Sequence, residues 1–313
     1  MKILIAGGSG FIGLALTSEL INNGHQVTIL TRKSTQTIQI VGKPVQFVHW
    51  DVSPSGEWVN LLDDHDGVIN LSGENIGGKN FYEVLFKRWN AQQKQLLRSS
   101  RIQSGEALTQ AIISRDRPPA FFIQASAVGY YGQHPDQVFT EESPPGNDFL
   151  ANLCVDWENS TTAVEQYGVR RAVIRIAGIV MGKDGGSLPF LLLPYKFFVG
   201  GPLGNGSQWV SWIHLKDLVR GIIFLMENKN SKGAYNLCSP NPITNRDLNK
   251  IIGRTMQRPS FMPFPEFAFR LIFGEKADAL LASQKQIPQR LIQEGFQFLY
   301  PTADMALKDI LEK

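Results

Sequence analysis

The 313-residue sequence predicts an α/β fold, a doubly wound parallel sheet with a smaller, mainly helical C-terminal lobe. Three observations lead to this prediction. A short apolar strand, a glycine-rich turn, a helix and a second strand fit within the first 32 residues. Apolar runs of strand length then alternate with helical patterns to about residue 240, which is typical of parallel strands joined by helical crossovers. From residue 241 the alternation stops, and prolines separate short helical stretches.

The first strand, at 1–6, leads directly into the turn Gly7-Gly-Ser-Gly10-Phe-Ile-Gly13. In a strand, turn and helix of this kind, Gly7 allows a tight turn and Gly10 lets a pyrophosphate approach the backbone. Gly13 lets the helix pack closely on the strand. The free N–H groups of a helix N-terminus favour phosphate. We therefore expect this turn, with Phe11 and Ile12, to bind a dinucleotide.

The end of the second strand, at 27–31, indicates which dinucleotide binds. Sites for NAD usually place Asp or Glu there, whereas this chain continues Thr31-Arg32-Lys33. A 2′-phosphate carries about two negative charges and suits a planar guanidinium. The sequence therefore predicts NADP(H), with Thr31 and Arg32 at the cofactor. The alternative is that Arg32 is a solvated surface charge.

Further strands are expected at 45–50, 67–71, 121–125, 171–176 and 234–238, and helices at about 88–114, 150–167 and 215–228. Ligands of such sheets bind beyond the carboxyl ends of the strands. The residues that follow the third and fourth strands are therefore cofactor candidates as well: Asp51, Leu71, Ser72 and Gly73. We expect an NADP-binding domain at 1–182 plus about 213–240. The smaller substrate lobe would comprise about 183–212 and 241–313.

The motifs resemble those of the extended short-chain dehydrogenase/reductases, the group that holds the NAD(P)-dependent epimerases and dehydratases. Within it the chain looks most similar to a subgroup of bacterial and organellar "epimerase family proteins". Besides the glycine turn, the resemblance rests on residues 70–75, 88–89, 126–132, 200–208, 212–217 and 288–301. It implies a Rossmann domain, NADP(H), and reversible hydride transfer at a carbon that bears oxygen.

The resemblance also implies three catalytic side chains: a Ser or Thr after the fifth strand, and a Tyr-x-x-x-Lys pair further along. Ser126 matches the first. The segment 148–158 should contain the pair, but its two registers put Phe149 or Leu150 at the tyrosine position and Leu153 or Cys154 at the lysine position. The usual mechanism therefore needs a substitute in this chain.

Tyr130 and Tyr131, four and five residues after Ser126, are the first candidates for a relocated acid/base. The alternative is that both rings only pack beneath the lobe. Without a neighbouring lysine, a catalytic tyrosine here should keep a pKa of about 10. Glu74 and Glu158 are further candidates if they are buried near the ligand, or else ion-pair partners.

Several cations are candidates for binding anions. Arg98 and Arg101 share one face of the helix after the fourth strand, and Arg101 is expected either to reach a cofactor phosphate or to be an exposed surface arginine. An anionic substrate would find four more candidates at Lys79, Arg88, Arg175 and His214.

Composition narrows the class of partner. The net charge of +3, without a basic cluster, argues against nucleic acid. The two cysteines show neither metal spacing nor a disulfide pattern, and no apolar stretch is long enough to span a bilayer. We expect a cytoplasmic protein with a small-molecule substrate, no metal and no membrane partner; a homodimer stays open.

Three functions fit these features. The first is an NADP(H)-dependent epimerase, dehydratase or reductase that acts on a sugar nucleotide or another small carbonyl or alcohol. The second is an NADP(H)-binding redox sensor or regulatory protein without catalysis, which the missing Tyr and Lys would suit. The third is a protein-interaction module on a vestigial Rossmann scaffold.

Overall fold

A computed structural model describes residues 1–32, 37–40, 42–76, 78, 83, 88–183 and 185–312. Its central sheet has the strand order β13-β8-β6-β5-β1-β2-β4-β3, in which β3 pairs antiparallel with β4 and the other neighbours pair in parallel. After β4 the chain crosses to the other side of β1 and continues with β5, which gives the doubly wound Rossmann order, so the predicted fold class is confirmed. The strands are β1 Lys2–Ala6, β2 Gln26–Thr31, β3 Thr37–Ile40, β4 Lys43–His49, β5 Gly67–Asn70, β6 Phe121–Ala127, β8 Arg170–Ile176 and β13 Gly233–Leu237.

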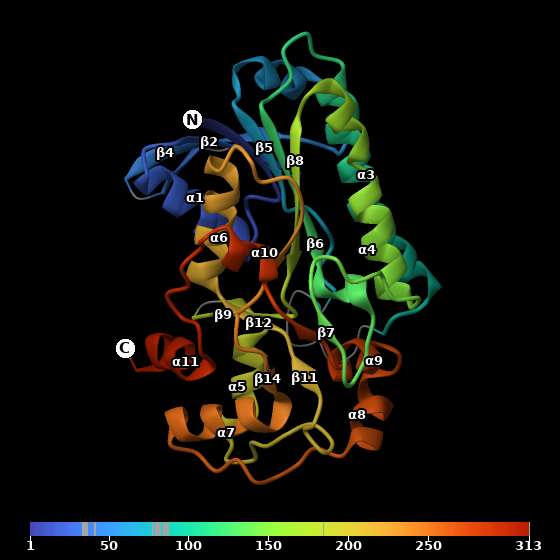
Figure 1. The fold of residues 1–313 in the computed structure, drawn as a ribbon, viewed down its shortest axis with the longest axis vertical. Coiled ribbons are helices and arrows are strands. Elements are labelled where there is room, and N and C mark those ends of the chain that lie inside the picture. Colours follow the sequence, from blue (N-terminus) through green and yellow to red (C-terminus); the bar gives the residue numbers. More distant parts are fainter. Residues whose placement is uncertain are drawn as a thin grey trace.

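Helices cover both faces of this sheet (Figure 1). α1 Phe11–Asn22 and α6 Leu215–Glu227 lie on one face, and α3 Ala91–Ile113 and α4 Phe149–Asn159 lie on the other. The helix expected at 150–167 is divided, because α4 ends at Asn159 and a 3-10 helix, η3 Thr162–Tyr167, follows it. Strand β3 was not predicted. A further 3-10 helix, η1 Glu57–Asp64, joins β4 to β5.

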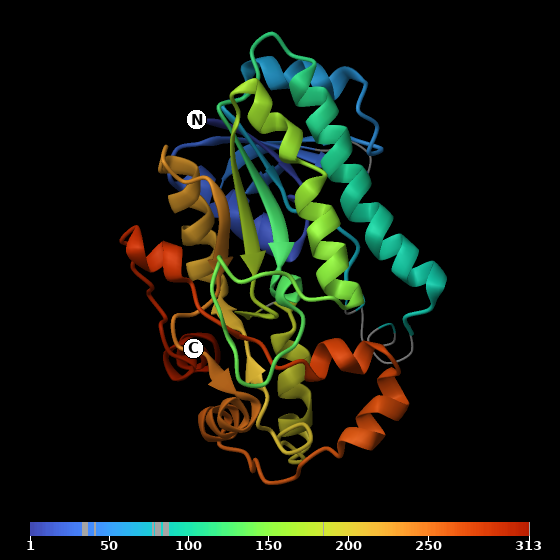
Figure 2. The same ribbon diagram turned by 45° about the vertical axis from the view of Figure 1, so that its right-hand side comes forward.

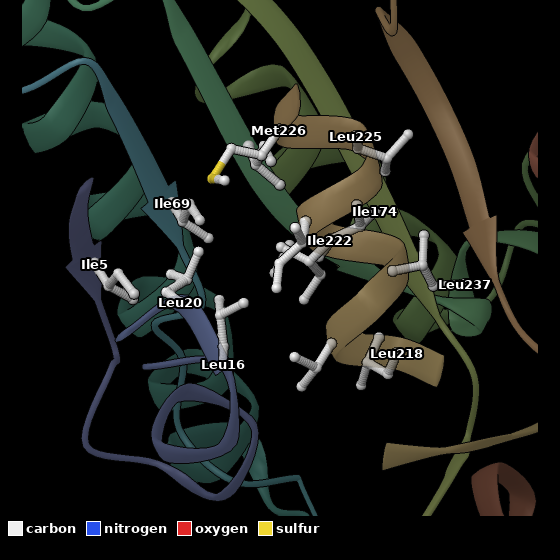
Figure 3. Close-up of a cluster of buried hydrophobic side chains, with 14 of the residues drawn as sticks. Ile5, Leu16, Leu20, Ile69, Ile174, Leu218, Ile222, Leu225, Met226 and Leu237 are labelled. Carbon is white, nitrogen blue, oxygen red and sulfur yellow. The ribbon is translucent and has the colours of Figure 1, made fainter. Parts of the chain in front are cut away.

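Apolar side chains between the sheet and helices α1 and α6 form the largest core. Figure 3 shows Leu16 and Leu20 of α1 close to Ile5 and Ile69 of the sheet, with Ile222 of α6 opposite them. Each of these side chains is fully buried. Complete burial of such a side chain contributes roughly 1.5–3 kcal/mol, so this layer fixes α1 on the strands that carry the glycine turn.

The lower part of the molecule holds the C-terminal helices and three small sheets (Figures 1 and 2). Its core lies among α5 (188–196), α7 (245–256) and α11 (303–311), where Leu192, Leu248 and Leu307 are buried together. The strands are β7 Val138–Phe139, β9 Ile179–Gly182, β10 Gly185–Gly186, β11 Trp209–Val210, β12 Trp212–His214, β14 Ile243–Thr244 and β15 Lys285–Gln286. The remaining helices of the protein are η2 Val128–Tyr131, α5 Leu188–Lys196, α7 Asn245–Met256, α8 Glu266–Phe273, α9 Lys276–Leu281, α10 Gln289–Gln293, which lies beside α6 and β13, and α11 Ala303–Leu311. Among the described residues, none of the helices is long and apolar enough to cross a membrane.

Candidate functional site

The glycine turn between β1 and α1 contains two glycines that the fold itself requires. Gly7 has φ +78°, and a Cβ built there would lie 2.7 Å from the Leu71 carbonyl carbon. A Cβ on Gly13 would lie 2.5 Å from the Gly8 Cα, because the first turn of α1 packs directly on the backbone of Gly7 and Gly8. Any larger residue at either position would force the backbone apart.

Gly10 differs from both. It is exposed, caps α1 with φ −83° and ψ 174°, and a Cβ there would meet only the Gly7 oxygen, at 3.4 Å. The fold alone would therefore accept a side chain at this position. No side chain caps the helix, and no acidic residue lies in its first turn. Open N–H groups beside a bare Cα suit an approaching pyrophosphate, so these residues fit a dinucleotide.

The two residues after Gly10 connect the turn to the rest of the protein. Ile12 packs partly buried against the main core. The Phe11 ring lies over the β9–β10 hairpin, where a Cβ on Gly182 or Gly185 would come within 2.6 Å of it. An open groove of about 740 Å³ lies beside Phe11, between α1, α6 and α11. Phe11 therefore links the candidate phosphate turn to the smaller lobe.

The ends of β2 and β4 lie next to the turn, because Leu30 pairs with Ala6 and Thr31 pairs with His49. Thr31 is buried, whereas Arg32 beyond it is exposed and has no ion-pair partner in the described part of the chain. Lys33 lies outside the described residues. Asp51 is exposed after β4, and its carboxylate accepts the Ser53 N–H at 2.9 Å.

The loop after β5 completes this edge. The Leu71 N–H donates to the Ala6 carbonyl at 2.8 Å, and the Ser72 N–H donates to Asn70 Oδ1 at 3.1 Å. Asn70 is itself held by Gln124 of the neighbouring strand, at 3.0 Å. The predicted cofactor residues at the ends of four neighbouring strands, including Leu71, Ser72 and Gly73, are thus brought to one edge of the sheet.

Arg101 is buried beneath this loop. The expectation that it is an exposed surface arginine is therefore wrong. The Arg101 guanidinium donates to the Leu97 and Glu74 carbonyls, each at 3.0 Å, and lies 4.9 Å from the centre of the Trp157 ring. Burial lowers the pKa of Arg101 to about 10. A Cβ on Gly73 would be 3.2 Å from this side chain. Arg101 therefore supports the loop from inside the protein, while Arg98 pairs with Asp156 at the surface.

The other half of the sheet edge is built from polar side chains. Ser126 pairs in register with Arg175, and Arg175 pairs with Asn236, so the three residues form a row across β6, β8 and β13. β6 extends to Ala127, which places Ser126 inside the strand and not after it. Ser126 Oγ donates to Glu158 Oε1 at 2.7 Å. Arg175 grips the same carboxylate with Nε at 2.9 Å and Nη2 at 3.0 Å.

Tyr131 belongs to this buried network. Its hydroxyl donates to Asn236 Oδ1 at 2.6 Å and accepts from Arg175 Nη1 at 3.0 Å. Gln286 donates to the same Asn236 oxygen at 2.8 Å. Burial raises the pKa of Tyr131 well above its usual range, although Arg175 opposes the shift. The expectation of a pKa near 10 is therefore wrong for Tyr131.

Tyr130 lies at the rim of the network. Its ring covers the Arg175 guanidinium at 3.4 Å and meets the Tyr131 ring edge-on at 5.2 Å. The side chain is half-buried, and its hydroxyl has no hydrogen-bond partner among the residues that the structure describes. Of the two predicted tyrosines, Tyr130 is thus the one whose phenol is available to a ligand.

The remaining candidates separate in a similar way. Lys79 lies outside the described residues. Arg88 is exposed and donates to the Leu271 carbonyl at 3.0 Å. His214 is buried, caps α6 through the Lys216 N–H and stacks on Tyr300.

Asn236 and Gln286 are polar residues that the sequence analysis missed. The one local signal for Asn236 is that it is a polar residue within the apolar run of β13. A polar side chain buried in such a strand normally makes hydrogen bonds.

The fold and the glycine turn define a dinucleotide-binding α/β protein. The family model of the NAD dependent epimerase/dehydratase family matches residues 3–238. The chain belongs to this family, an NAD(P)-dependent, epimerase-like group. A second family model, the domain of unknown function DUF1731, matches residues 264–310 and so covers much of the C-terminal region.

Relatives match along nearly the whole chain. The chloroplastic epimerase family protein SDR39U1 homolog of Arabidopsis thaliana is 35% identical over all of this chain and 87% of its own length. The epimerase family protein YfhF of Bacillus subtilis is 36% identical, covering 99% of this chain and 98% of that protein. The crystal structure of the human epimerase family protein SDR39U1 (isoform 2) with NADPH is 31% identical, with a TM-score of 0.87 and full coverage of both chains.

Proposed function

We propose that this chain is an NADP(H)-dependent enzyme of the epimerase, dehydratase or reductase type, acting on a sugar nucleotide or another small carbonyl or alcohol. The observation that carries the proposal is Gly10, which the fold does not require and which leaves the N-terminus of α1 open to phosphate. When bound, the nicotinamide supplies or accepts a hydride at a carbon that bears oxygen. The NADPH in the human relative's crystal structure supports the same choice of cofactor.

The residues of this chain would divide the binding work. Gly10 and the N–H groups that follow it would hold the pyrophosphate. Arg32, exposed after β2 and without an ion-pair partner among the described residues, would hold the 2′-phosphate. Asp51 and the loop at Leu71–Gly73 would line the space beside them, at the ends of β4 and β5.

Tyr130 would exchange the proton of the substrate oxygen. A general acid/base must reach that oxygen with a donor that is not already engaged. Tyr130 meets this condition, because its hydroxyl is open and its ring is fixed on Arg175 at 3.4 Å. Ser126 and Tyr131 would act as positioning residues, since both hydroxyls bond within the network that holds Arg175.

One observation favours a second function, an NADP(H)-binding sensor. The Ser126 hydroxyl donates a hydrogen bond to Glu158, and the Tyr131 hydroxyl donates one to Asn236. Two of the three expected catalytic hydroxyls are therefore engaged in hydrogen bonds within the protein. A sensor needs only the dinucleotide site. A screen for hydride transfer between NADPH and a panel of carbonyl compounds separates the two functions, because a sensor would turn over none of them.

Replacing Arg32 by Ala tests the cofactor assignment. We expect NADPH affinity to fall by about 1.5–3 kcal/mol, typical of a lost charge-assisted contact, and NADH affinity to change little. Isothermal titration calorimetry with both cofactors measures this difference. Arg117→Ala, an exposed arginine before β6 at the opposite edge of the sheet, is the matched control and should leave both affinities unchanged. An equal loss for NADPH and NADH would overturn the role of Arg32.

A further inference from the structure

The end of helix α5 and the segment after helix α7 together expose a group of large apolar side chains. The two segments lie side by side at the lower end of the molecule (Figures 1 and 2). The Met262 N–H donates to the Gly200 carbonyl at 3.2 Å, and Gly200 forms an isolated parallel bridge with Ser260. The exposed side chains are Phe197 (69%), Phe198 (55%), Val199 (46%), Phe261 (72%) and Met262 (46%), which we call the tip surface.

The backbone of Phe198 is unusual for an aromatic residue. Its φ is +62°, directly after the end of α5, and its N–H donates to the Tyr195 carbonyl at 3.1 Å. Helices commonly end with glycine in this left-handed conformation, because a side chain there costs about 1–2 kcal/mol. Phe198 occupies the position with its ring largely exposed, so packing inside the protein does not explain the strain.

Two cations, Lys196 and Arg258, lie next to residues of the tip surface. Lys196 is exposed at the end of α5, and the Arg258 guanidinium lies 4.5 Å from the centre of the Phe198 ring. Neither cation pairs with an acidic side chain in the described part of the protein. Other cations of the same lobe do have acidic partners: Lys250 with Asp247, Arg254 with Asp304, and Arg270 with Asp278. The tip surface is therefore both apolar and cationic.

We propose that the tip surface docks on a membrane whose lipids are anionic. The exposed rings would enter the interface between head groups and acyl chains, and Lys196 and Arg258 would lie against lipid phosphates and carboxylates. A second copy of the chain is a poorer occupant. In a two-fold symmetric contact the same surface meets itself, so the unpaired cations of the two copies would face each other. The expectation of no membrane partner rested on the finding that no apolar stretch of the sequence is long enough to span a bilayer. Attachment to a membrane surface does not require such a stretch.

Vesicle co-sedimentation of the full-length protein tests the proposal. We expect binding to phosphatidylserine-containing vesicles at low salt and much weaker binding to pure phosphatidylcholine, with screening at high salt. The variant Phe197→Ser/Phe261→Ser should lower the partition coefficient at least about tenfold, because two exposed rings no longer enter the interface. Lys196→Gln/Arg258→Gln should lower it about fivefold per cation removed.

Matched variants away from the tip surface serve as controls. Ile292→Ser changes an apolar residue that is 50% exposed on α10, and Lys229→Gln/Lys232→Gln removes two exposed charges. Neither should change vesicle binding. Circular dichroism and thermal melts confirm that each variant folds. Absence of wild-type binding to anionic vesicles would overturn the proposal, as would equal losses in the controls. Concentration-dependent dimerisation that Phe197→Ser/Phe261→Ser abolishes, without vesicle binding, would assign the surface to a second copy instead.

Discussion

The two halves of the sheet's carboxyl edge differ in how far their polar groups are exposed. At the ends of β1, β2, β4 and β5 the surface is mostly backbone, with Gly10 bare and Arg32 and Asp51 exposed. At the ends of β6, β8 and β13 a row of polar side chains is buried. There Ser126, Arg175 and Asn236 bond to Glu158 and Tyr131 within the protein.

We infer from this difference which half of the sheet edge binds a ligand. Open N–H groups at a helix N-terminus gain a partner only when an anion or water arrives. A buried network whose donors and acceptors already meet is rigid and has no donor left for a substrate. We therefore propose that the first half receives the cofactor, whereas Arg175 of the second half holds the ring of Tyr130.

Disrupting the buried polar network at the ends of β6, β8 and β13 should have the largest effect on stability. Glu158→Ala leaves the Arg175 guanidinium buried without its carboxylate, and we expect the free energy of unfolding to fall by about 3–5 kcal/mol. Denaturant unfolding measures this loss. Glu266→Ala is the control, because that carboxylate and its partner Arg270 are both about half exposed, and its loss should cost less than about 1 kcal/mol. Similar losses in the two variants would mean that the network is not specially stabilising.

A substitution at Gly10 in the glycine turn should abolish cofactor binding without unfolding the protein. Gly10→Val places a branched side chain where the pyrophosphate would lie, at backbone angles that valine accepts. We expect a thermal melt near that of the wild type and no shift on adding NADPH. Gly13→Val should instead lower the melting temperature, since its Cβ would meet the Gly8 Cα. Retained NADPH binding by Gly10→Val would place the phosphate elsewhere.

The neighbouring tyrosines sharpen the comparison, because they differ in location but not in chemistry. Tyr131→Phe leaves the buried Asn236 and Arg175 groups short of a partner, and should cost about 1–3 kcal/mol of stability. Tyr130→Phe should leave stability unchanged and reduce turnover of any substrate that the hydride-transfer screen finds. If Tyr130→Phe keeps full turnover, the sensor function moves ahead of the enzyme.

The smallest effect concerns pH. Glu141 accepts the Asn236 and Arg290 N–H groups, and burial raises its pKa above the ordinary value of 4.5. Glu141 thus binds its proton more tightly in the folded protein than in the unfolded chain. Its contribution to the free energy of unfolding is therefore fully present below pH 4.5 and is lost as the pH rises through the raised pKa of Glu141. Glu141→Gln should flatten that part of the stability profile, whereas Glu142→Gln, its exposed neighbour, should not.

The sequence by itself determined the parallel sheet and the half of its edge that is made of backbone. Short apolar runs between glycines and helical patterns are local signals, and they placed the seven parallel strands to within a few residues. The glycine turn is equally local, because Gly7, Gly10 and Gly13 lie within seven residues of each other and their spacing carries the chemistry. The candidate cofactor residues therefore followed from the sequence.

Only the tertiary structure decided which polar side chains are available. Ser126, Arg175 and Asn236 are far apart in the chain, and the strand register alone makes them neighbours. Tyr130 and Tyr131 are adjacent in sequence, yet only the Tyr131 hydroxyl is hydrogen-bonded to Arg175 of β8 and to Asn236 of β13, whereas β8 meets Tyr130 through its ring alone. Burial depends on which elements pack together, and a side chain's own sequence neighbourhood does not contain that information.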